Sequence, residues 1–171
     1  MKINNKYIIM ITSIIAIILI FVCCILLVDS SKKYRWKISL QSISKNNLLS
    51  SKDAIEVNKP ISSSTAITFN VKLLPKTKIV YDVVIQNTGT IDASFDNISG
   101  IETINGIAPK EITYKVEKLD GINGDIYNGN NELQKEIGKN YFRVTIENSS
   151  NDPKPLEKKG TINFEYIQRE E

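Results

Sequence analysis

The residues that could do chemistry in this chain are carboxylates, because the other common catalytic and metal-binding side chains are scarce. The sequence of 171 residues contains no histidine, and its two cysteines, Cys23 and Cys24, lie inside a long apolar run. These facts exclude Ser-His-Asp and Cys-His catalysis, the common zinc sites and a disulfide in the polar part of the chain. The group of acidic residues that comes nearest to a catalytic set consists of Asp82, Asp92, Asp96 and Glu102.

Two carboxylates with separated pKa values can serve as a general acid and a general base. Asp82, however, alternates with apolar residues, which predicts a solvent-facing position on a strand. Asp92 and Asp96 lie beside a turn, where acidic side chains accept hydrogen bonds from local backbone. We therefore expect no catalytic residue and no cofactor, and a protein that is not an enzyme.

A second group of oxygen donors lies in the polar segment 120–132. The calcium candidates there are Asp120, Asp125 and Glu132, accompanied by the amides of Asn123, Asn128, Asn130 and Asn131. Calcium prefers such hard oxygen ligands, but Ile122 and Tyr127 occupy positions that need oxygen donors in the twelve-residue EF-hand loop. The spacing therefore favours an ordinary polar loop without metal.

The elements that would position these groups begin with an apolar run at residues 8–28. The run contains no charge, and its polar side chains are Thr12 and Ser13. As an α-helix it would extend about 31 Å, which matches the roughly 30 Å hydrocarbon thickness of a bilayer. It is apolar on every face, whereas a helix on a domain surface carries an apolar stripe. We predict one transmembrane helix, preceded by a short cytoplasmic head at residues 1–7.

The two flanks of this run have the composition of a membrane interface. In segment 29–37 cations alternate with aromatic rings, as is typical of residues in the headgroup layer. The predicted interface residues are Tyr7, Lys32, Lys33, Tyr34, Arg35 and Trp36. The net charge of +3 is otherwise spread along the chain without a basic stripe. This pattern predicts membrane lipid as a partner and argues against nucleic acid.

Three fates of the apolar run stay open: a retained anchor, a cleaved signal peptide and a lipid-modified cysteine. A signal peptide has a shorter apolar region with a small-residue cleavage pattern, whereas this run is followed by Asp29. Bulky residues also precede Cys23, where a lipoprotein would have small ones. We favour a retained anchor over cleavage near Ser30 or lipidation.

The orientation of the chain is a separate prediction. Counting flank cations mildly favours a cytoplasmic domain. We nevertheless predict a single-pass protein of the cell membrane with its N-terminus inside and its domain outside. The short basic head before a long apolar run is typical of an exported chain, and a thiol-free domain rich in Asn and Thr suits a bacterial surface.

Beyond residue 36 the pattern indicates strands, because apolar and polar residues alternate with a period of two. The expected strands cover 36–40, 67–73, 78–86, 91–95, 112–116, 141–148 and 161–168, with a shorter one at 54–57. Segment 46–64 otherwise reads as a polar connection broken by Pro60. Segment 78–86 is apolar on both faces and is expected to be central. We expect Asn87 and Gly89 to form a tight left-handed turn into a return strand.

These strands predict an all-β fold, an antiparallel β-sandwich of the Ig-like or jelly-roll type with one N-terminal transmembrane helix. The sandwich is expected to cover residues 38–169, with a tail at 170–171. Short helical inserts near Leu48 or at 132–137 are compatible with this architecture.

Two runs carry a resemblance to a known group of proteins. The first, 74–93, has a turn with Pro75, an apolar strand that ends in Asn87-Thr88-Gly89, and then Asp92-Ala93. The second is the closing strand 160–168. Together they resemble the sandwich modules of TasA and camelysin-like envelope proteins of Gram-positive bacteria. The resemblance implies an extracellular domain of a matrix, a fibre or a surface structure, although this chain keeps an apparent anchor and lacks a sortase signal.

Two functions follow from these patterns. The first is a non-enzymatic, membrane-anchored module at the bacterial cell envelope that binds another envelope protein or a matrix polymer. The second is an accessory or sensor subunit of a membrane complex, whose transmembrane helix contacts the partner. Replacing the helix by an unrelated one would abolish the second function and leave the first intact.

Overall fold

The structure, a computed structural model, describes residues 13–25, 35–121, 126, 129 and 131–169. The chain divides into two units, Met1–Arg35 and Trp36–Glu171. In the first unit residues 13–25 form a helix with exposed apolar side chains. Within the described ranges no helix is long and apolar enough to cross a bilayer. Residues 8–12 and 26–28 of the predicted transmembrane helix lie outside those ranges.

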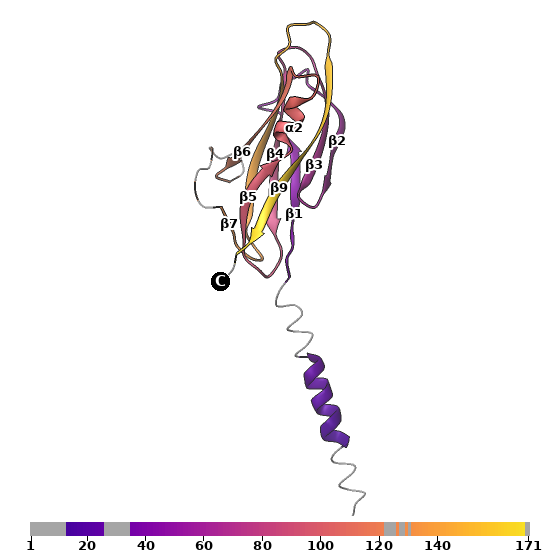
Figure 1. The fold of residues 1–171 in the computed structure, drawn as a ribbon, viewed down its shortest axis with the longest axis vertical. Helices are drawn as coiled ribbons and strands as arrows, with labels where there is room; N and C mark the ends of the chain where they lie inside the picture. Colours follow the sequence, from indigo (N-terminus) through magenta and orange to yellow (C-terminus); the bar gives the residue numbers. More distant parts are fainter. Residues whose placement is uncertain (1–12, 26–34, 122–125, 127–128, 130, 170–171) are drawn as a thin grey trace, which may run out of the picture. The chain divides into compact units, whose positions relative to one another are not determined.

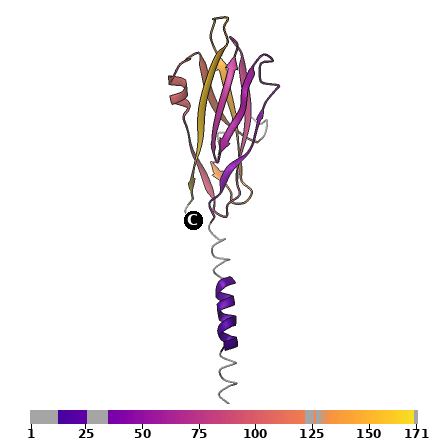
Figure 2. The same ribbon diagram turned by 90° about the vertical axis from the view of Figure 1, so that its right-hand side faces the viewer.

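The second unit consists of two antiparallel sheets, as Figures 1 and 2 show. The first sheet has the order β1 (Ile38–Lys45), β4 (Lys78–Asn87), β8 (Lys139–Asn148) and β6 (Ile112–Leu119). The second has the order β2 (Ile55–Ser63), β3 (Ala66–Leu73), β9 (Leu156–Gln168), β5 (Ala93–Ser99) and β7 (Glu132–Leu133). One short helix, α2 (Ile101–Gly106), joins β5 to β6. The predicted all-β, sandwich-like class is confirmed.

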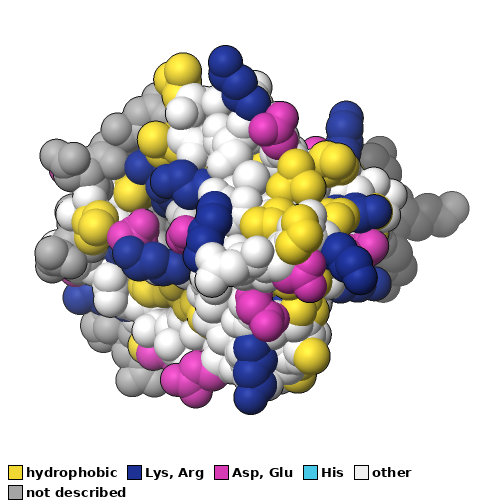
Figure 3. Space-filling view, turned by 90° about the horizontal axis from the view of Figure 1, so that it is seen from above, with side chains coloured by type: hydrophobic (Ala, Val, Ile, Leu, Met, Phe, Trp, Pro, Cys, Tyr) yellow, Lys and Arg dark blue, Asp and Glu magenta, His cyan; other side chains and the backbone are white. Residues whose placement is uncertain are grey.

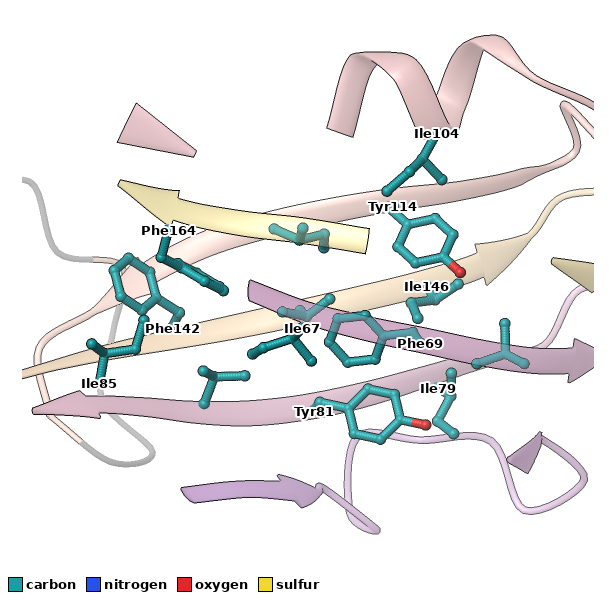
Figure 4. Packing of buried hydrophobic residues seen from close by; sticks show 14 of the residues in the cluster. Ile67, Phe69, Ile79, Tyr81, Ile85, Ile104, Tyr114, Phe142, Ile146 and Phe164 are labelled. Atoms are coloured by element: carbon teal, nitrogen blue, oxygen red, sulfur yellow. The ribbon is translucent and has the colours of Figure 1, made fainter. Parts of the chain in front are cut away.

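The core lies between the two sheets, where alternate residues of facing strands meet (Figure 4). Strand β3 shows the period clearly, since its inward side chains are all fully buried: Ile67, Phe69, Val71 and Leu73. Aromatic rings connect the sheets, with centroids 5.0 Å apart for Phe69 and Tyr81 and 4.6 Å apart for Phe142 and Phe164. Burying each such side chain contributes roughly 1.5–3 kcal/mol before the cost of chain entropy.

Strand β4 is central in its sheet, as its composition predicts. It pairs with β1 on one side and β8 on the other. Its inward residues join the core, and Val80 and Val84 on the opposite face are also buried, at 2% and 5% exposure. Apolar residues on both faces therefore correctly indicate a strand that is covered on both sides.

Strand β2 corrects the prediction of a polar connection at 46–64. The expected short strand at 54–57 is instead nine residues long and includes Pro60. Proline lacks a backbone N–H, but β2 is an edge strand and its register shifts between Asn58 and Ile61. An edge or a bulge tolerates proline because a ladder hydrogen bond is not required there.

The turn after β4 differs from the expected left-handed hairpin. Neither Asn87 nor Gly89 has a positive φ. Asn87 is buried, and its amide Nδ2 donates to the carbonyls of Ile91 at 2.8 Å and Leu133 at 3.1 Å. Its Oδ1 accepts from the N–H of Gly89 at 2.9 Å. The Asn87 side chain thus links the end of β4 to the loop that follows it and to β7. The chain then crosses to the other sheet as β5 and does not return beside β4.

The helical insert is not at either predicted place. Leu48 lies in a turn at 47–49, and Glu132–Leu133 forms strand β7. Helix α2 instead follows β5, and its one buried residue, Ile104, joins the core. A Cβ at Gly160 would lie 2.8 Å from the Ile104 side chain, so the short helix packs tightly onto β9.

Candidate functional site

Asp82 lies in a polar cluster on the outer face of the four-stranded sheet. Its carboxylate accepts a hydrogen bond from Asn46 Nδ2 at 2.7 Å and pairs with Arg143 Nε at 3.0 Å. The predicted face is correct, but the predicted exposure is wrong, because Asp82 is only 8% exposed. Each oxygen of the carboxylate has a partner, as a buried charge requires. This arrangement serves structure.

The structure does not gather the other predicted carboxylates around Asp82. Asp92 Oδ1 accepts from the backbone N–H of Lys135 at 2.7 Å. Its partner is therefore 43 residues away along the chain, in the turn between β7 and β8, and not the local backbone that the sequence predicts. Asp96 is exposed on β5, and Glu102 is exposed in the first turn of α2. Within the described ranges, no three His, Cys, Asp or Glu residues are placed to hold a metal ion.

Two of the three calcium candidates do come together. Asp120 and Glu132 line one hollow of about 160 Å³, whose walls also include Lys118 and Lys139. Glu132 additionally pairs with Arg169. The third candidate, Asp125, lies outside the described residues. The cations beside the two carboxylates oppose binding of a divalent ion, so calcium at this hollow is not supported.

Lys158 is a buried polar residue that the sequence patterns did not single out. It is 3% exposed, and its Nζ donates to the carbonyls of Ile107, Pro109 and Ile112 at 3.1, 2.9 and 2.8 Å. Burial lowers the pKa of Lys158, while the carboxylate of Glu111 opposes this effect. The three bonds tie β9 to the segment between α2 and β6. The sequence could have indicated this burial, because Lys158 alternates with a period of two with Gly160, Ile162 and Phe164, which are inward positions of β9.

Three tyrosines place their hydroxyl groups in the interior. Tyr81 OH donates to Glu56 Oε1 at 2.9 Å, and Tyr114 OH donates to the carbonyl of Lys158 at 3.3 Å. Tyr166 OH is buried without a hydrogen-bond partner in the described part of the chain. Burial raises the pKa of all three phenols, so they stay protonated at neutral pH. They serve the core and supply no acid or base near pH 7.

The predicted interface residues are only partly described. Tyr7, Lys32, Lys33 and Tyr34 lie outside the described residues, whereas Arg35 and Trp36 are exposed. Trp36 is the first residue of the second unit and borders a hollow of about 230 Å³ that Tyr166 also lines. Trp36 is 43% exposed, which leaves apolar surface in contact with solvent.

The free edge of the five-stranded sheet is the second apolar surface. Strand β2 exposes Ile55, Val57 and Ile61 at 56%, 37% and 68%. We call these three residues the β2 edge. The end of the sandwich seen in Figure 3 shows cations and carboxylates interspersed among apolar areas, the largest of which lies right of centre. Apolar residues aligned on a strand edge are typical of a surface that meets another molecule.

No protein-family model, curated protein or solved structure matches this chain.

Proposed function

We propose that this protein is a membrane-anchored, non-enzymatic binding module, with a structural role at the bacterial cell envelope. Residues 8–28 serve as a single-pass anchor, and an extracytoplasmic sandwich of the Ig-like or jelly-roll type contacts another envelope protein or a matrix polymer. The resemblance of segments 74–93 and 160–168 to TasA and camelysin-like modules favours the same role.

The observation that carries the proposal is the β2 edge. Exposed β-branched side chains on an edge strand suit contact with a second surface, because their burial on binding is favourable and costs little side-chain entropy. Pro60 and the two shifts in the register of β2 with β3 make this edge strand irregular. Such features prevent indiscriminate pairing with other strands. We therefore expect the partner to be recognised through side chains.

The carboxylates support a module without catalysis, because their geometry is that of structural groups. Both carboxylate oxygens of Asp82 have partners, in Asn46 and Arg143. Asp92 accepts a hydrogen bond from the backbone of the turn between β7 and β8. A catalytic acid or base needs a free oxygen within reach of a substrate. In the described part of the chain the carboxylates predicted as candidates do not share a cleft.

The test places a benzophenone amino acid at Ile61 of the full chain expressed in its host cells. Irradiation is expected to yield a discrete, larger adduct, because the side chain is 68% exposed on the proposed surface. Thr113, exposed on the edge strand β6 of the other sheet, is the matched control and should give no such adduct. Equal adducts from both positions, or none from Ile61, would remove the β2 edge as the binding surface.

A further inference from the structure

We propose that one end of the sandwich docks on the surface of a lipid bilayer. We call it the Trp36 end and define it by the exposed residues Trp36, Lys37, Lys135, Ile137, Lys139 and Ile167. The inference rests on the proposed anchor and adds a second membrane contact, made by the folded domain itself. The occupant is a lipid headgroup layer.

Backbone hydrogen bonds bring distant segments to this end. The N–H of Thr88 donates to the carbonyl of Lys37 at 2.9 Å, which places the loop after β4 beside the start of β1. The N–H of Glu136 donates to the carbonyl of Gly89 at 2.9 Å, which adds the turn between β7 and β8. Figures 1 and 2 show that β7, the end of β9 and the start of β1 share one end of the sandwich.

The turn between β7 and β8 presents an apolar tip. Ile137 is 70% exposed, and the turn is closed by a hydrogen bond of 2.9 Å from the N–H of Gly138 to the carbonyl of Gln134. Lys135 and Lys139 lie on either side of Ile137 in sequence, and both are exposed. An isoleucine between lysines suits a headgroup layer, where the apolar group enters the acyl boundary and the cations meet phosphates.

Two more apolar side chains at this end have the same character. Trp36 is 43% exposed and Ile167 is 52% exposed. Tryptophan is enriched at membrane interfaces, because its ring is apolar and its N–H can reach water or headgroups. The acidic groups nearby are Glu136, Asp92 and Glu132, and the last of these pairs with Arg169. A fourth acidic group, Asp120, lines the same hollow as Lys139. These carboxylates offset the charges of Lys37, Lys135 and Lys139, so the exposed apolar side chains carry the proposed contact.

The length of the tether argues for lipid over a protein partner. Trp36 follows the last residue of the apolar run, Val28, by eight positions. Eight residues reach at most about 29 Å when fully extended. An anchored chain therefore holds this end close to the bilayer. The resulting effective concentration of the Trp36 end at the lipid surface is high, so that even weak interfacial contacts contribute to binding.

The experiment uses the full chain with Cys23→Ser and Cys24→Ser, reconstituted into vesicles of phosphatidylcholine and phosphatidylglycerol. One preparation carries Ile137→Cys and the other Leu48→Cys, each labelled with an environment-sensitive fluorophore. Leu48 is 96% exposed, and its loop adjoins Lys78, at the other end of β4, through the bond from Ser51 N–H to the Lys78 carbonyl. A strand of this length separates the two probes by about 30 Å.

We expect the probe at Ile137 to emit at shorter wavelength in vesicles than in detergent, and to be quenched several-fold more than the Leu48 probe by headgroup spin-labelled lipid. Flotation of the vesicles tests the anchor separately. Protein that floats while both probes are quenched equally would overturn the docking proposal and leave the anchor in place. Protein that fails to float would overturn the anchor, and the docking proposal with it. Unchanged circular dichroism verifies that each labelled variant is folded.

Discussion

Most buried polar side chains in this sandwich have hydrogen-bond partners, and Tyr166 is an exception. Asp82 has Asn46 and Arg143, and Lys158 has three carbonyl acceptors. Partnered groups offset the free energy of leaving water, whereas an unpartnered hydroxyl does not. Tyr166 OH has no partner in the described part of the chain, so its ring stabilises the core and its hydroxyl does not.

The change Tyr166→Phe tests this assignment. At pH 7 we expect unfolding free energy that is unchanged or higher by up to about 1 kcal/mol, because the substitution removes an unsatisfied group. Tyr81→Phe is the control, since Tyr81 OH donates to Glu56, and should lower stability by about 1 kcal/mol. Urea unfolding followed by circular dichroism measures both. A loss for Tyr166→Phe as large as that for Tyr81→Phe would mean that the hydroxyl has a partner.

The pH dependence of the same variant gives an independent measure. Burial raises the pKa of Tyr166 in the folded state, so the unfolded chain loses this proton first. Below about pH 10 the phenol of Tyr166 is protonated in both states, and its titration does not change stability. As the pH rises further, deprotonation favours the unfolded chain, so the free energy of unfolding falls. Above pH 10 the stability of the unsubstituted protein should fall more steeply than that of Tyr166→Phe, by about 1.4 kcal/mol per pH unit.

At the scale of the elements, helix α2 depends on two glycines for its place against β9. Gly100 precedes the helix with φ +93°, and a Cβ there would lie 2.4 Å from the carbonyl oxygen of Thr161. Gly160 leaves room on β9 for Ile104. Only a residue without a side chain allows both the left-handed turn and the close approach of the backbones.

Gly100→Ala should destabilise the sandwich by about 2 kcal/mol or more, because it adds a clash to backbone strain. Gly121→Ala separates the two effects, since Gly121 has φ +85° and an added Cβ would have no atom of the described residues within 4 Å, and should cost about 1 kcal/mol. Gly106→Ala has neither constraint and should change stability by less than about 0.5 kcal/mol. Thermal unfolding ranks the three variants. Equal losses for Gly100→Ala and Gly121→Ala would show that the approach to Thr161 is not tight.

At the scale of the whole molecule, the sandwich unit begins at Trp36 and its surfaces have different characters. The β2 edge is proposed for a partner at the envelope, and the Trp36 end for lipid. The first proposal depends on which side of the membrane the unit occupies, because matrix polymers and envelope partners are found outside the cell.

Leu48→Cys in the Cys23→Ser, Cys24→Ser chain decides the orientation. Leu48 is 96% exposed, so a thiol there is open to reagents. On whole cells we expect labelling by a membrane-impermeant maleimide. The chain without any cysteine is the control for background. Labelling only after the membrane is opened would place the sandwich in the cytoplasm and favour the accessory-subunit hypothesis.

Local patterns predicted the strands well where one face is apolar. Alternation located β3, β6, β8 and the second half of β9, and apolar residues on both faces identified β4. The same method missed most of β2, because an edge strand exposes both faces and carries Pro60. It also missed the length of β9, whose first half includes Lys158 among inward positions.

By itself, the sequence determined the all-β class, the central strand β4 and the absence of thiol and imidazole chemistry from the polar part of the chain, since these depend on residue types and on a period of two. Only the tertiary structure decided that Asp82 is buried, that Lys158 binds three carbonyls and that Ile137 and Trp36 lie at one end. These facts depend on strand pairing between residues far apart in sequence. A local pattern states which face a side chain takes, but the neighbouring strand determines what covers it.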